Sequence, residues 1–467
     1  MSAPARPPEG GASSPGEDVA QRQEGGPVSA PARPPEGGAS SPGEDVAQRQ
    51  EATPVRPRGS VVVLGAGLVG LACAHALQRD GFTVTVVDRG GVGEGASFGN
   101  AAHIAIASII PQSTPGIIGQ TIRLLKDPAG PLIVRPGYAA RHLPWFARFV
   151  AQGTAERARA GTHAMAAMMA QAWDAWQPVL EDIGGGELVR QSGALHVFGS
   201  QAALRAAQAA YDLRRSLGVT CTPVDLEQAR TMEPALTEQV GAVVWIPGMG
   251  YVTDTLALAR RLAERIESRG GRILRAEATG VDARGVRTKE GRLDADRVVL
   301  AAGAWSHRLA RGLGVDIPLV SERGYHVMLA PGSSPLRMPV LMVERKVALT
   351  PMAAGIRMAS VAEFAAADAR ADHARAERVF RGLERFVQGL DAEPVSRWVG
   401  PRPSVPDSRP ILGQAPGAPH VLLAYGHGHL GVTLAALTGR VIADVASGRD
   451  PGIDMRAVAP LRSARLR

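Results

Sequence analysis

A short apolar run, SVVVL at Ser60–Leu64, is followed by the sequence GAGLVG and then by an amphipathic stretch. A continuous apolar run of this length predicts a strand that is buried on both faces. The residues after it predict a helix over Leu68–Arg79, which Gly81 ends. The next run, FTVTVVD, predicts a second strand that finishes at Asp88. This order predicts two neighbouring parallel strands joined by a helix.

Similar elements return much later in the chain. The stretch 257–288 predicts an amphipathic helix, a strand and a polar hairpin, and Val298–Ala301 predicts another strand. Near the end, Val421–Tyr425 predicts a strand, and the turn GHGHLG leads into a helix that runs to about Ser447. We expect these elements to join the first two strands in one sheet.

The central parts of the chain, 116–248 and 313–394, carry none of these patterns. They contain alanine-rich helical stretches at Ala158–Val179 and Ala202–Leu217, and short strands such as ALHVFG and YHVMLA. We expect an antiparallel sheet with helices here. The predicted fold class is therefore α/β, with a Rossmann-like domain and a second α+β domain between which the chain crosses several times.

The first 57 residues differ from everything after them. The sequence SAPARPPEGGASSPGEDVAQRQE occupies Ser2–Glu24 and recurs unchanged at Ser29–Glu51. Because small, polar and proline residues dominate and little apolar surface is available for burial, we expect residues 1–57 to be disordered. A tandem duplication, or a start codon assigned too early, explains the repeat better than a docking tail does.

Charge and cysteine content narrow the class of protein. The formal charge is +8 and the pI about 10.1, but the arginines are scattered along the chain. A nucleic-acid-binding protein would gather such charge into runs with interleaved aromatic residues, so we expect no nucleic-acid partner. The two cysteines, Cys73 and Cys221, have no metal-binding or redox spacing. We therefore expect no metal site and a reducing, cytoplasmic location.

The sequence contains no apolar run that is long enough to cross a bilayer. The best candidate, Ala101–Gly119, is interrupted by Pro111 and Pro115. No secretory signal opens the sequence. We expect no transmembrane segment, and peripheral attachment to the inner face of a membrane stays open as an alternative.

The glycines after the first strand have the spacing GxGxxG, which is typical of dinucleotide binding. Gly65 allows a tight turn, Gly67 lets a pyrophosphate approach the backbone, and Gly70 lets helix and strand pack closely. The helix N-terminus would direct free N–H groups at the phosphates. Asp88, about 20 residues further on, would accept hydrogen bonds from ribose hydroxyls. The residues between the glycines belong to the same predicted cofactor site: Ala66, Leu68 and Val69.

FAD and NAD both bind to this pattern, so the choice depends on later residues. The second strand is followed by RGGVGEGASFGNAAHIA, a glycine-rich stretch with Ser97 and Asn100 that suits a long, flat cofactor. An NAD enzyme would return quickly to another alternating helix and strand. The late helix begins beside Gly426, Gly428 and Gly431, and its positive dipole end suits a flavin ring that gains negative charge on reduction. These features favour FAD.

From about Arg58 to Arg456 the chain resembles the FAD-dependent D-amino-acid oxidase superfamily. The resemblance is carried by the motifs VVVLGAGLVG, VTVVDRG, GASFGNAAH, VVLAAGAWS, RGYHVML, GPRPSVPDSRPILG and GHGHLGVTLAALTGR. The chain is most similar to the bacterial D-amino-acid dehydrogenases and their hydroxyproline-type relatives, and more distantly to glycine and sarcosine oxidases. The resemblance implies hydride transfer from the Cα of an amino acid to FAD.

The resemblance also implies roles for single residues. Arg402 corresponds to the arginine that holds the substrate carboxylate. Tyr325 and His326 of RGYHV are further candidate catalytic residues in the substrate cavity, and packing of strand residues under a loop explains them equally well. Cofactor contacts are implied for a set of residues along the adenosine, the pyrophosphate, the ribityl chain and the flavin ring: Asp88, Arg89, Ser97, Asn100, Ala101, Thr279, Gly303, Gly428, His429, Leu430 and Gly431.

Two departures from the family pattern concern the cofactor. Many D-amino-acid dehydrogenases have Asn-Ala-Gly where this chain continues from Asn100 through two alanines to His103, so we expect His103 to reshape the site. Relatives with covalent flavin use an early histidine or a late cysteine. Here Asn100 takes roughly the first of these places, and no cysteine follows Cys221. We therefore expect noncovalent FAD.

The implied reaction is the oxidative deamination of a D-amino acid, with D-proline and cis-4-hydroxy-D-proline among the candidates. The imino acid would hydrolyse to a 2-oxo acid and ammonia, whereas a cyclic substrate would give a cyclic imine. The alternatives are a glycine- or sarcosine-type amine oxidase and the flavin subunit of a multi-subunit dehydrogenase. The electron acceptor stays open between oxygen, a quinone and another carrier.

These predictions divide the chain into two domains and two tails. The FAD-binding domain is expected to comprise 58–115, 249–312 and 395–456, the substrate domain 116–248 and 313–394, and the tails 1–57 and 457–467.

Overall fold

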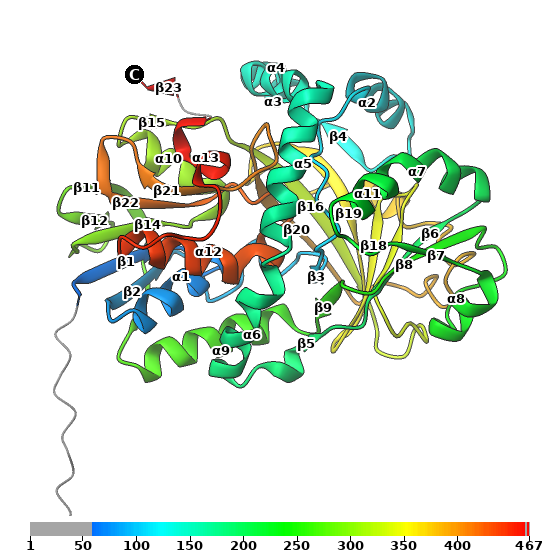
Figure 1. The fold of residues 1–467 in the computed structure, drawn as a ribbon, viewed down its shortest axis with the longest axis horizontal. Coiled ribbons are helices and arrows are strands. Elements are labelled where there is room, and N and C mark those ends of the chain that lie inside the picture. Colours follow the sequence, from blue (N-terminus) through cyan, green and yellow to red (C-terminus); the bar gives the residue numbers. More distant parts are fainter. Residues whose placement is uncertain (1–57, 463–464, 467) are drawn as a thin grey trace, which may run out of the picture. The chain divides into compact units, whose positions relative to one another are not determined.

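Two sheets of different construction organise the described part of the chain (Figure 1). The computed structural model describes residues 58–462 and 465–466. The duplicated segment and its predicted disorder lie outside these residues. Among the described helices, none combines the length and the apolar character that crossing a membrane requires.

The first sheet has six strands and contains the predicted parallel unit. Its order is β10-β2-β1-β14-β22-β21, and every neighbouring pair is parallel except β21 and β22. The strands are β1 (Ser60–Leu64), β2 (Thr83–Asp88), β10 (Arg272–Arg275), β14 (Arg297–Leu300), β21 (Ile411–Ala415) and β22 (Ala418–Tyr425). The predicted return of the late elements to the first sheet is therefore confirmed.

The two faces of this sheet are covered differently. Val61 and Val63 of β1 pack into a core with the helices α1 (Leu68–Arg79), α6 (Ala172–Ile183), α9 (Thr255–Ser268) and α12 (Gly431–Ala446). Val62 and Leu64 face a second core, because side chains of a strand alternate between its faces. That core includes α10 (Ser306–Arg311) and the three-stranded sheet β11 (Ala278–Asp282), β12 (Gly285–Thr288) and β13 (Arg292–Asp294).

Helices α1 and α12 lie against each other beneath the parallel strands (Figure 1). A Cβ atom on Gly439 of α12 would lie 2.4 Å from the backbone oxygen of Ala72 in α1. The two backbones therefore approach so closely that only glycine fits at this position. This packing places the N-terminus of each helix at the same edge of the sheet, near the carboxyl ends of β1 and β22.

The second sheet has nine strands in the order β20-β16-β19-β18-β17-β6-β8-β7, with β4 pairing beside β19. It is antiparallel, as predicted, except for the parallel pairs β17 with β6 and β19 with β4. Its strands are β4 (Leu132–Val134), β6 (Ala194–Phe198), β7 (Thr222–Val224), β8 (Ala242–Ile246), β16 (Val320–Leu329), β17 (Val340–Met342), β18 (Val347–Met352), β19 (Gly355–Phe364) and β20 (Ser396–Ser404).

Eight further α-helices and several small strands complete the described fold. The helices are α2 (Ile117–Lys126), α3 (Pro136–Arg141), α4 (Leu143–Gln152), α5 (Ala155–Met169), α7 (Gln201–Ser216), α8 (Leu226–Met232), α11 (His373–Arg378) and α13 (Met455–Val458). Strands β3 (His103–Ile104), β9 (Gly250–Val252) and β5 (Val189–Arg190) form one small sheet, and β15 (Val315–Asp316) pairs with β23 (Arg465–Leu466).

The helical stretch predicted at 158–179 is helical and is divided between two helices. The chain turns between Met169 and Ala172, where α5 ends and α6 begins. Both helices pack against α12. The buried residues Met165, Met168 and Trp176 belong to that shared core. A break lets each helix bury its own apolar face there, and such tertiary packing overrides local helix propensity.

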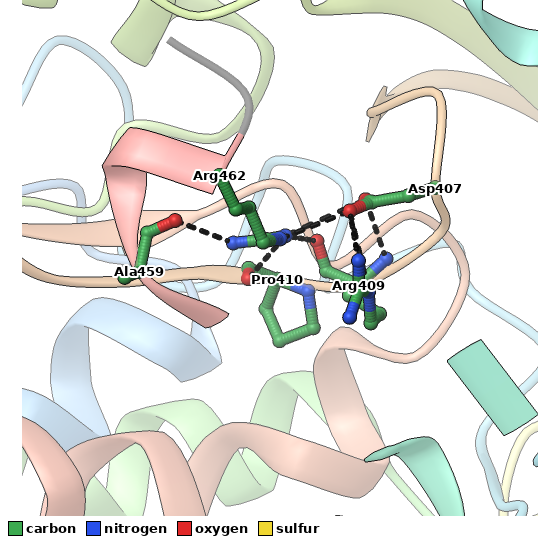
Figure 2. A network of polar contacts seen from close by, with 5 residues as sticks. All are labelled: Asp407, Arg409, Pro410, Ala459 and Arg462. Carbon is green, nitrogen blue, oxygen red and sulfur yellow. Dashed lines mark hydrogen bonds and ion pairs between the residues drawn. The ribbon is translucent and has the colours of Figure 1, made fainter. Parts of the chain in front are cut away.

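The chain crosses between the two sheets in the loop after β20, and the C-terminal residues hold this loop (Figure 2). The guanidinium of Arg462 donates to a carboxylate oxygen of Asp407 over 2.9 Å and to the backbone oxygens of Arg409 and Pro410. Arg409 also pairs with Asp407. Burial opposes ionisation of Asp407, but the two guanidiniums outweigh it and lower the pKa of this carboxyl.

The expected domain boundary at residue 395 lies one residue before β20, a strand of the nine-stranded sheet. The crossing to the parallel sheet comes only after Ser404, at the loop shown in Figure 2. The division into two domains stays a prediction, whereas the membership of β20 in the second sheet follows from its pairing with β16.

Candidate active site

A cavity of about 560 Å³ lies at the carboxyl ends of β1, β2, β14 and β22. Both sheets contribute to its lining, since β17, β18 and β20 supply residues as well as the parallel strands. Ligands of open α/β sheets bind at this edge, outside the carboxyl ends of the strands. The cavity therefore has the position expected of a cofactor and substrate site.

The three glycines of GxGxxG meet different constraints. A Cβ on Gly65 would lie 2.4 Å from the backbone oxygen of Ala301, and one on Gly70 would lie 1.9 Å from the backbone oxygen of Gly65. These two glycines therefore let β1, β14 and α1 approach one another. Gly67 precedes α1 and lines the cavity, where backbone N–H groups of the helix N-terminus are available to an anion.

Asp88 is fixed by two backbone N–H groups at the end of β2. Its Oδ2 accepts from Ala66 and its Oδ1 accepts from Gly90, each over 2.8 Å. The carboxylate lines the cavity and, with about four lone-pair positions, can accept further hydrogen bonds. This geometry suits binding of a ribose diol beside the glycine turn.

An aromatic platform lies next to this carboxylate. The guanidinium of Arg89 stacks over the ring of Trp305, 3.8 Å from the ring centroid, and both side chains line the cavity. Gly303, two residues before the tryptophan, also lines it. Sequence reasoning missed Trp305, although it belongs to the motif AAGAWS that was singled out for its glycine.

The loop after β2 is held in one conformation by its own polar residues. Ser97 Oγ accepts from the N–H of Leu68, the first residue of α1. The Asn100 side chain donates to the backbone oxygen of Ser97 and accepts from the N–H of Ala102. That bonding helps to stabilise Ala102 at a φ of 60°, an uncommon value for a residue with a side chain.

A buried arginine supports the same loop from the second sheet. Arg357 donates to the backbone oxygens of Phe98 and Asn100 over 3.0 and 2.9 Å. Burial lowers the pKa of this guanidinium to about 10. Arg357 is therefore a positive charge behind the loop, and its position on β19 was not apparent from the sequence.

The N-terminus of α12 forms another wall of the cavity. Gly428, His429 and Gly431 line it, whereas Leu430 is buried beside them. Burial lowers the pKa of His427 to about 4, and its Nε2 lies 2.8 Å from the hydroxyl of Thr438. His427 is thus neutral near pH 7. The helix N-terminus contributes positive potential at this wall.

Arg402 reaches the cavity from β20. Its Nη1 donates to Glu322 Oε1 over 3.2 Å and to the backbone oxygen of Val361 over 3.1 Å. The other oxygen of Glu322 accepts from Ser404 over 2.6 Å. Val361 has a φ of 68°, which is strained for a β-branched residue. The guanidinium lies over Gly324, where a Cβ would be 2.2 Å from Nη2.

Residues of the second sheet and of nearby loops complete the cavity opposite the nucleotide turn. Leu341, Ala348 and Met249 contribute apolar surface. His103 and His196 also line it, and burial lowers their pKa values to about 4 and about 3. These imidazoles are therefore neutral near pH 7. Of these five residues, the sequence pointed only to His103.

The sequence profile of a family described as "FAD dependent oxidoreductase" matches residues 60–445. The chain belongs to this family. Its similarity to curated relatives extends over most of the sequence. A D-amino-acid oxidase of Bradyrhizobium diazoefficiens is 32% identical over 414 residues, which is 86% of this chain and 98% of that protein. A D-amino acid dehydrogenase of Rhodopseudomonas palustris is 30% identical over 413 residues, covering 85% and 96%.

Solved structures of similar fold include the glycine oxidase of Geobacillus kaustophilus. It has a TM-score of 0.69 at 20% identity, and the alignment covers 86% of this chain and 98% of that one. The predicted fold class, family and flavin cofactor are thus confirmed. The chain is an FAD-dependent oxidoreductase of the D-amino-acid oxidase and dehydrogenase type, which acts on the C–N group of amino acids.

The residues present fit the FAD of this family. The cavity joins a glycine turn, a fixed carboxylate at Asp88 and the N-termini of α1 and α12. Phosphate groups would be held by the N–H groups that precede and begin α1. The ribose would meet Asp88, and the flavin ring would lie by the loop at Asn100 and the turn at Gly428.

Seven of the predicted site residues do not line the cavity, and three of these belong to the strands β11 and β16. Tyr325 points into the core of the second sheet, where its hydroxyl donates to Glu363 over 2.6 Å. Thr279 is exposed and donates to the backbone oxygen of Arg287, and the neighbouring residues 276–278 line the cavity instead. His326 lies behind the lining, stacked on Trp398, with its Nδ1 2.9 Å from the backbone oxygen of Gly99.

Each of the other predicted residues either lines the cavity or lies directly beside a residue that does. Those that line the cavity are Gly65, Gly67, Val69, Asp88, Arg89, Ser97, Asn100, Ala101, Gly303, Arg402, Gly428, His429 and Gly431. Ala66, Leu68, Gly70 and Leu430 are the supporting neighbours of this lining. Within the described residues, no three His, Cys, Asp or Glu side chains form a group that could hold a metal ion.

Proposed function

We propose that this chain catalyses the oxidative deamination of a D-amino acid. The observation that carries the proposal is Arg402, a guanidinium from β20 that lines the same cavity as Asp88. A planar guanidinium binds a carboxylate through two hydrogen bonds and so fixes the rest of the substrate. The names of the relatives, a D-amino-acid oxidase and a D-amino acid dehydrogenase, support the same substrate class.

The reaction depends on positioning more than on acid–base groups. Bound FAD would accept the hydride that leaves the substrate Cα. Arg402 would bind the carboxylate, and Glu322 would hold the guanidinium in place through its 3.2 Å contact. His103 and His196 are neutral near pH 7 because of burial, so neither competes with Arg402 for the anion. Such fixed geometry supplies a large share of catalysis in reactions without a general base.

The walls of the cavity suggest an uncharged substrate side chain. Leu341, Ala348 and Met249 provide apolar contact on the side of the second sheet. We propose aliphatic or cyclic D-amino acids, including D-proline and cis-4-hydroxy-D-proline. The product imino acid would hydrolyse in water to a 2-oxo acid and ammonia, and a cyclic substrate would leave as a cyclic imine.

We propose further that FAD is bound without a covalent link. The Asn100 side chain is engaged in hydrogen bonds within its own loop. Both cysteines are buried free thiols, outside the cavity lining. Free thiols also favour the cytoplasm as the working compartment. Acid precipitation tests the link, because noncovalent flavin stays in the supernatant whereas a yellow pellet would contradict the proposal.

The substrate proposal is tested by anaerobic bleaching of the flavin spectrum. The purified yellow protein is mixed with a panel of D- and L-amino acids, D-proline, cis-4-hydroxy-D-proline, glycine and sarcosine. Bleaching by D-isomers and not by their L-partners is expected. Bleaching by glycine or sarcosine alone would indicate an amine oxidase. Reduction of the flavin only after a second protein is added would indicate a subunit of a larger dehydrogenase.

A further inference from the structure

The exposed apolar side chains are concentrated in one segment. Of the six large apolar side chains that the described residues expose, five belong to α2 and α4. They are Ile118, Ile122, Leu125, Leu143 and Val150, and the sixth is Val395. Ile118 is 57% exposed and Leu143 is 65% exposed. Apolar surface that gathers in this way marks an interaction site, whereas single exposed residues are ordinary.

Helix α2 has two different apolar edges. Ile118, Ile122 and Leu125 are spaced i, i+4 and i+7, so they form one exposed stripe along the helix. Ile117 and Leu124 are half-buried on the neighbouring edge that faces the protein. No residue of α2 is fully buried. The helix therefore rests on the protein along one edge and presents a second apolar edge to its surroundings.

Basic side chains flank the exposed stripe. Residues 116–152 contain five basic residues and one acidic residue, Asp127. Arg135 pairs with Glu363. The other four, Arg123, Lys126, Arg141 and Arg148, form no hydrogen bond or ion pair through their side chains with any described residue. Half of the chain's formal charge of +8 thus lies in this short segment.

The segment is fixed to the second sheet and is not a loose appendage. Trp145 of α4 packs with Phe364 of β19, and its Nε1 donates to the backbone oxygen of Ser404 over 3.2 Å. Ser113, just before α2, donates to the backbone oxygen of Phe149 at the end of α4. Helix α2 contacts β4, a strand of the same sheet. Figure 1 shows α2, α3 and α4 together at the top of the view.

We propose that α2 and α4 form a docking surface for an anionic lipid bilayer. The exposed apolar side chains would enter the boundary between headgroups and acyl chains, and the four unpaired cations would contact anionic headgroups. A second copy of the chain fits less well, because the same unpaired cations would then face one another across the interface. The proposal concerns the surface alone and does not depend on the identity of the amino-acid substrate.

The test uses the full chain with its flavin and sedimentation with vesicles. Vesicles of phosphatidylcholine alone are compared with vesicles in which about one third of the lipid is phosphatidylglycerol. Binding is expected only to the anionic vesicles, and it should weaken as salt is raised. The double variants Ile118→Ser/Ile122→Ser and Arg123→Glu/Lys126→Glu should each lose about tenfold or more in vesicle affinity. Flavin reduction in solution should be unchanged.

Matched controls use the same changes elsewhere on the surface. Val395→Ser changes the sixth exposed apolar residue, and Arg205→Glu reverses an exposed arginine on α7. Both should bind vesicles as the parent does. Leu143→Ser/Val150→Ser gives a second apolar variant, on α4, if the α2 variant fails to fold.

Three results would overturn the proposal. The first is no sedimentation with anionic vesicles, and the second is binding that survives the α2 and α4 variants. The third is a dimer in lipid-free solution that Ile118→Ser/Ile122→Ser abolishes, which would assign the surface to a second copy. The proposal is supported if the protein sediments with anionic vesicles and if the α2 and α4 variants reduce this binding while the two control variants do not.

Discussion

Arg402 Nη1 lies 3.2 Å from Glu322 Oε1, and the two residues face each other in register on the adjacent strands β20 and β16. Glu322 is 2% exposed, whereas Arg402 is 24% exposed and lines the cavity. The buried carboxylate therefore holds the guanidinium from behind. A substrate carboxylate would approach from the cavity side, and the arginine would then lie between two anions.

Replacement of Arg402 tests its role as a carboxylate clamp. Arg402→Ala should slow anaerobic flavin reduction by a D-amino acid about a hundredfold or more, because truncating one partner of a desolvated ion pair costs about 2–5 kcal/mol. Arg402→Lys keeps the charge but loses the two-point fork, so its rate should fall between. The flavin spectrum should stay normal in both. Loss of FAD in the alanine variant would show instead that Arg402 is a structural residue.

Gly324 leaves room for the guanidinium of Arg402. A Cβ at this position would lie 2.2 Å from Nη2, so Gly324→Ala should push the guanidinium away from its place over the strand. We expect the apparent dissociation constant of the substrate to rise about tenfold, with FAD retained, since a misplaced positioning group weakens binding by such factors. Stopped-flow reduction over a range of substrate concentrations separates this effect from a change in the limiting rate.

A matched glycine-to-alanine substitution elsewhere distinguishes displacement of the Arg402 guanidinium from a general loss of stability. Gly137, in the exposed helix α3, has open space around its Cβ position. Gly137→Ala should leave substrate binding at the parental level. An equal loss in both variants would mean that Gly324 acts through stability and not through Arg402.

Local sequence patterns were sufficient to predict the strand, turn and helix of the nucleotide-binding unit. The predicted bounds of β1 and α1 agree with the structure, because a short apolar run, a glycine turn and an amphipathic stretch each specify their own conformation. Asp88 could be found for the same reason, since it ends a strand that the pattern already defined. The family resemblance then supplied Arg402, whose motif is long enough to be specific.

The substrate side of the cavity could not be found in this way. Glu322 and Arg402 are 80 residues apart, and only the pairing of β16 with β20 brings them together. The wall at Leu341 and Ala348 likewise depends on the order of strands in the second sheet. Non-local pairing of this kind leaves no signal in a single sequence.

Strand geometry explains why Tyr325 does not line the cavity. Side chains alternate between the two faces of a strand, so Arg323 and Tyr325 lie on the face of the sheet opposite to that of Gly324. Glu322 and Gly324 face Arg402, whereas Arg323 and Tyr325 face Glu363 in the core. Once Gly324 is assigned to the cavity face, the tyrosine must lie on the other side of the sheet.

His326 predicts a pH dependence of stability. Burial, together with the nearby charge of Arg357, lowers the pKa of His326 to about 4. The folded protein therefore keeps this imidazole neutral, while the unfolded chain takes up a proton near pH 6.5. Stability should be constant above about pH 6.5 and fall as the pH is lowered from 6.5 towards 4.

His326→Gln should show a smaller loss of stability over the same pH range. The urea concentration at the unfolding midpoint is measured for the flavin-loaded parent and variant, near neutral pH and at about pH 5, and the change between the two pH values is compared. The loss should not vanish, because burial also lowers the pKa values of His103, His196 and His427. His163→Gln, at an exposed position on α5, serves as the control and should behave as the parent does. An unchanged pH dependence in the His326 variant would contradict the prediction.

Asp88 offers the sharpest test of the cofactor site, because its two roles predict different outcomes. The carboxylate accepts from the N–H groups of Ala66 and Gly90, so it shapes the turn even without a ligand. If it also binds the ribose, Asp88→Ala loses one or two charge-assisted hydrogen bonds to FAD, worth about 1.5–3 kcal/mol each. The dissociation constant for FAD should then rise at least about tenfold, measured by quenching of flavin fluorescence. Asp80→Ala, which breaks an ion pair with Arg449 at the far end of α1, should retain FAD as the parent does. A variant at position 88 that binds FAD normally but melts earlier would confine Asp88 to the turn, and the ribose would need another partner.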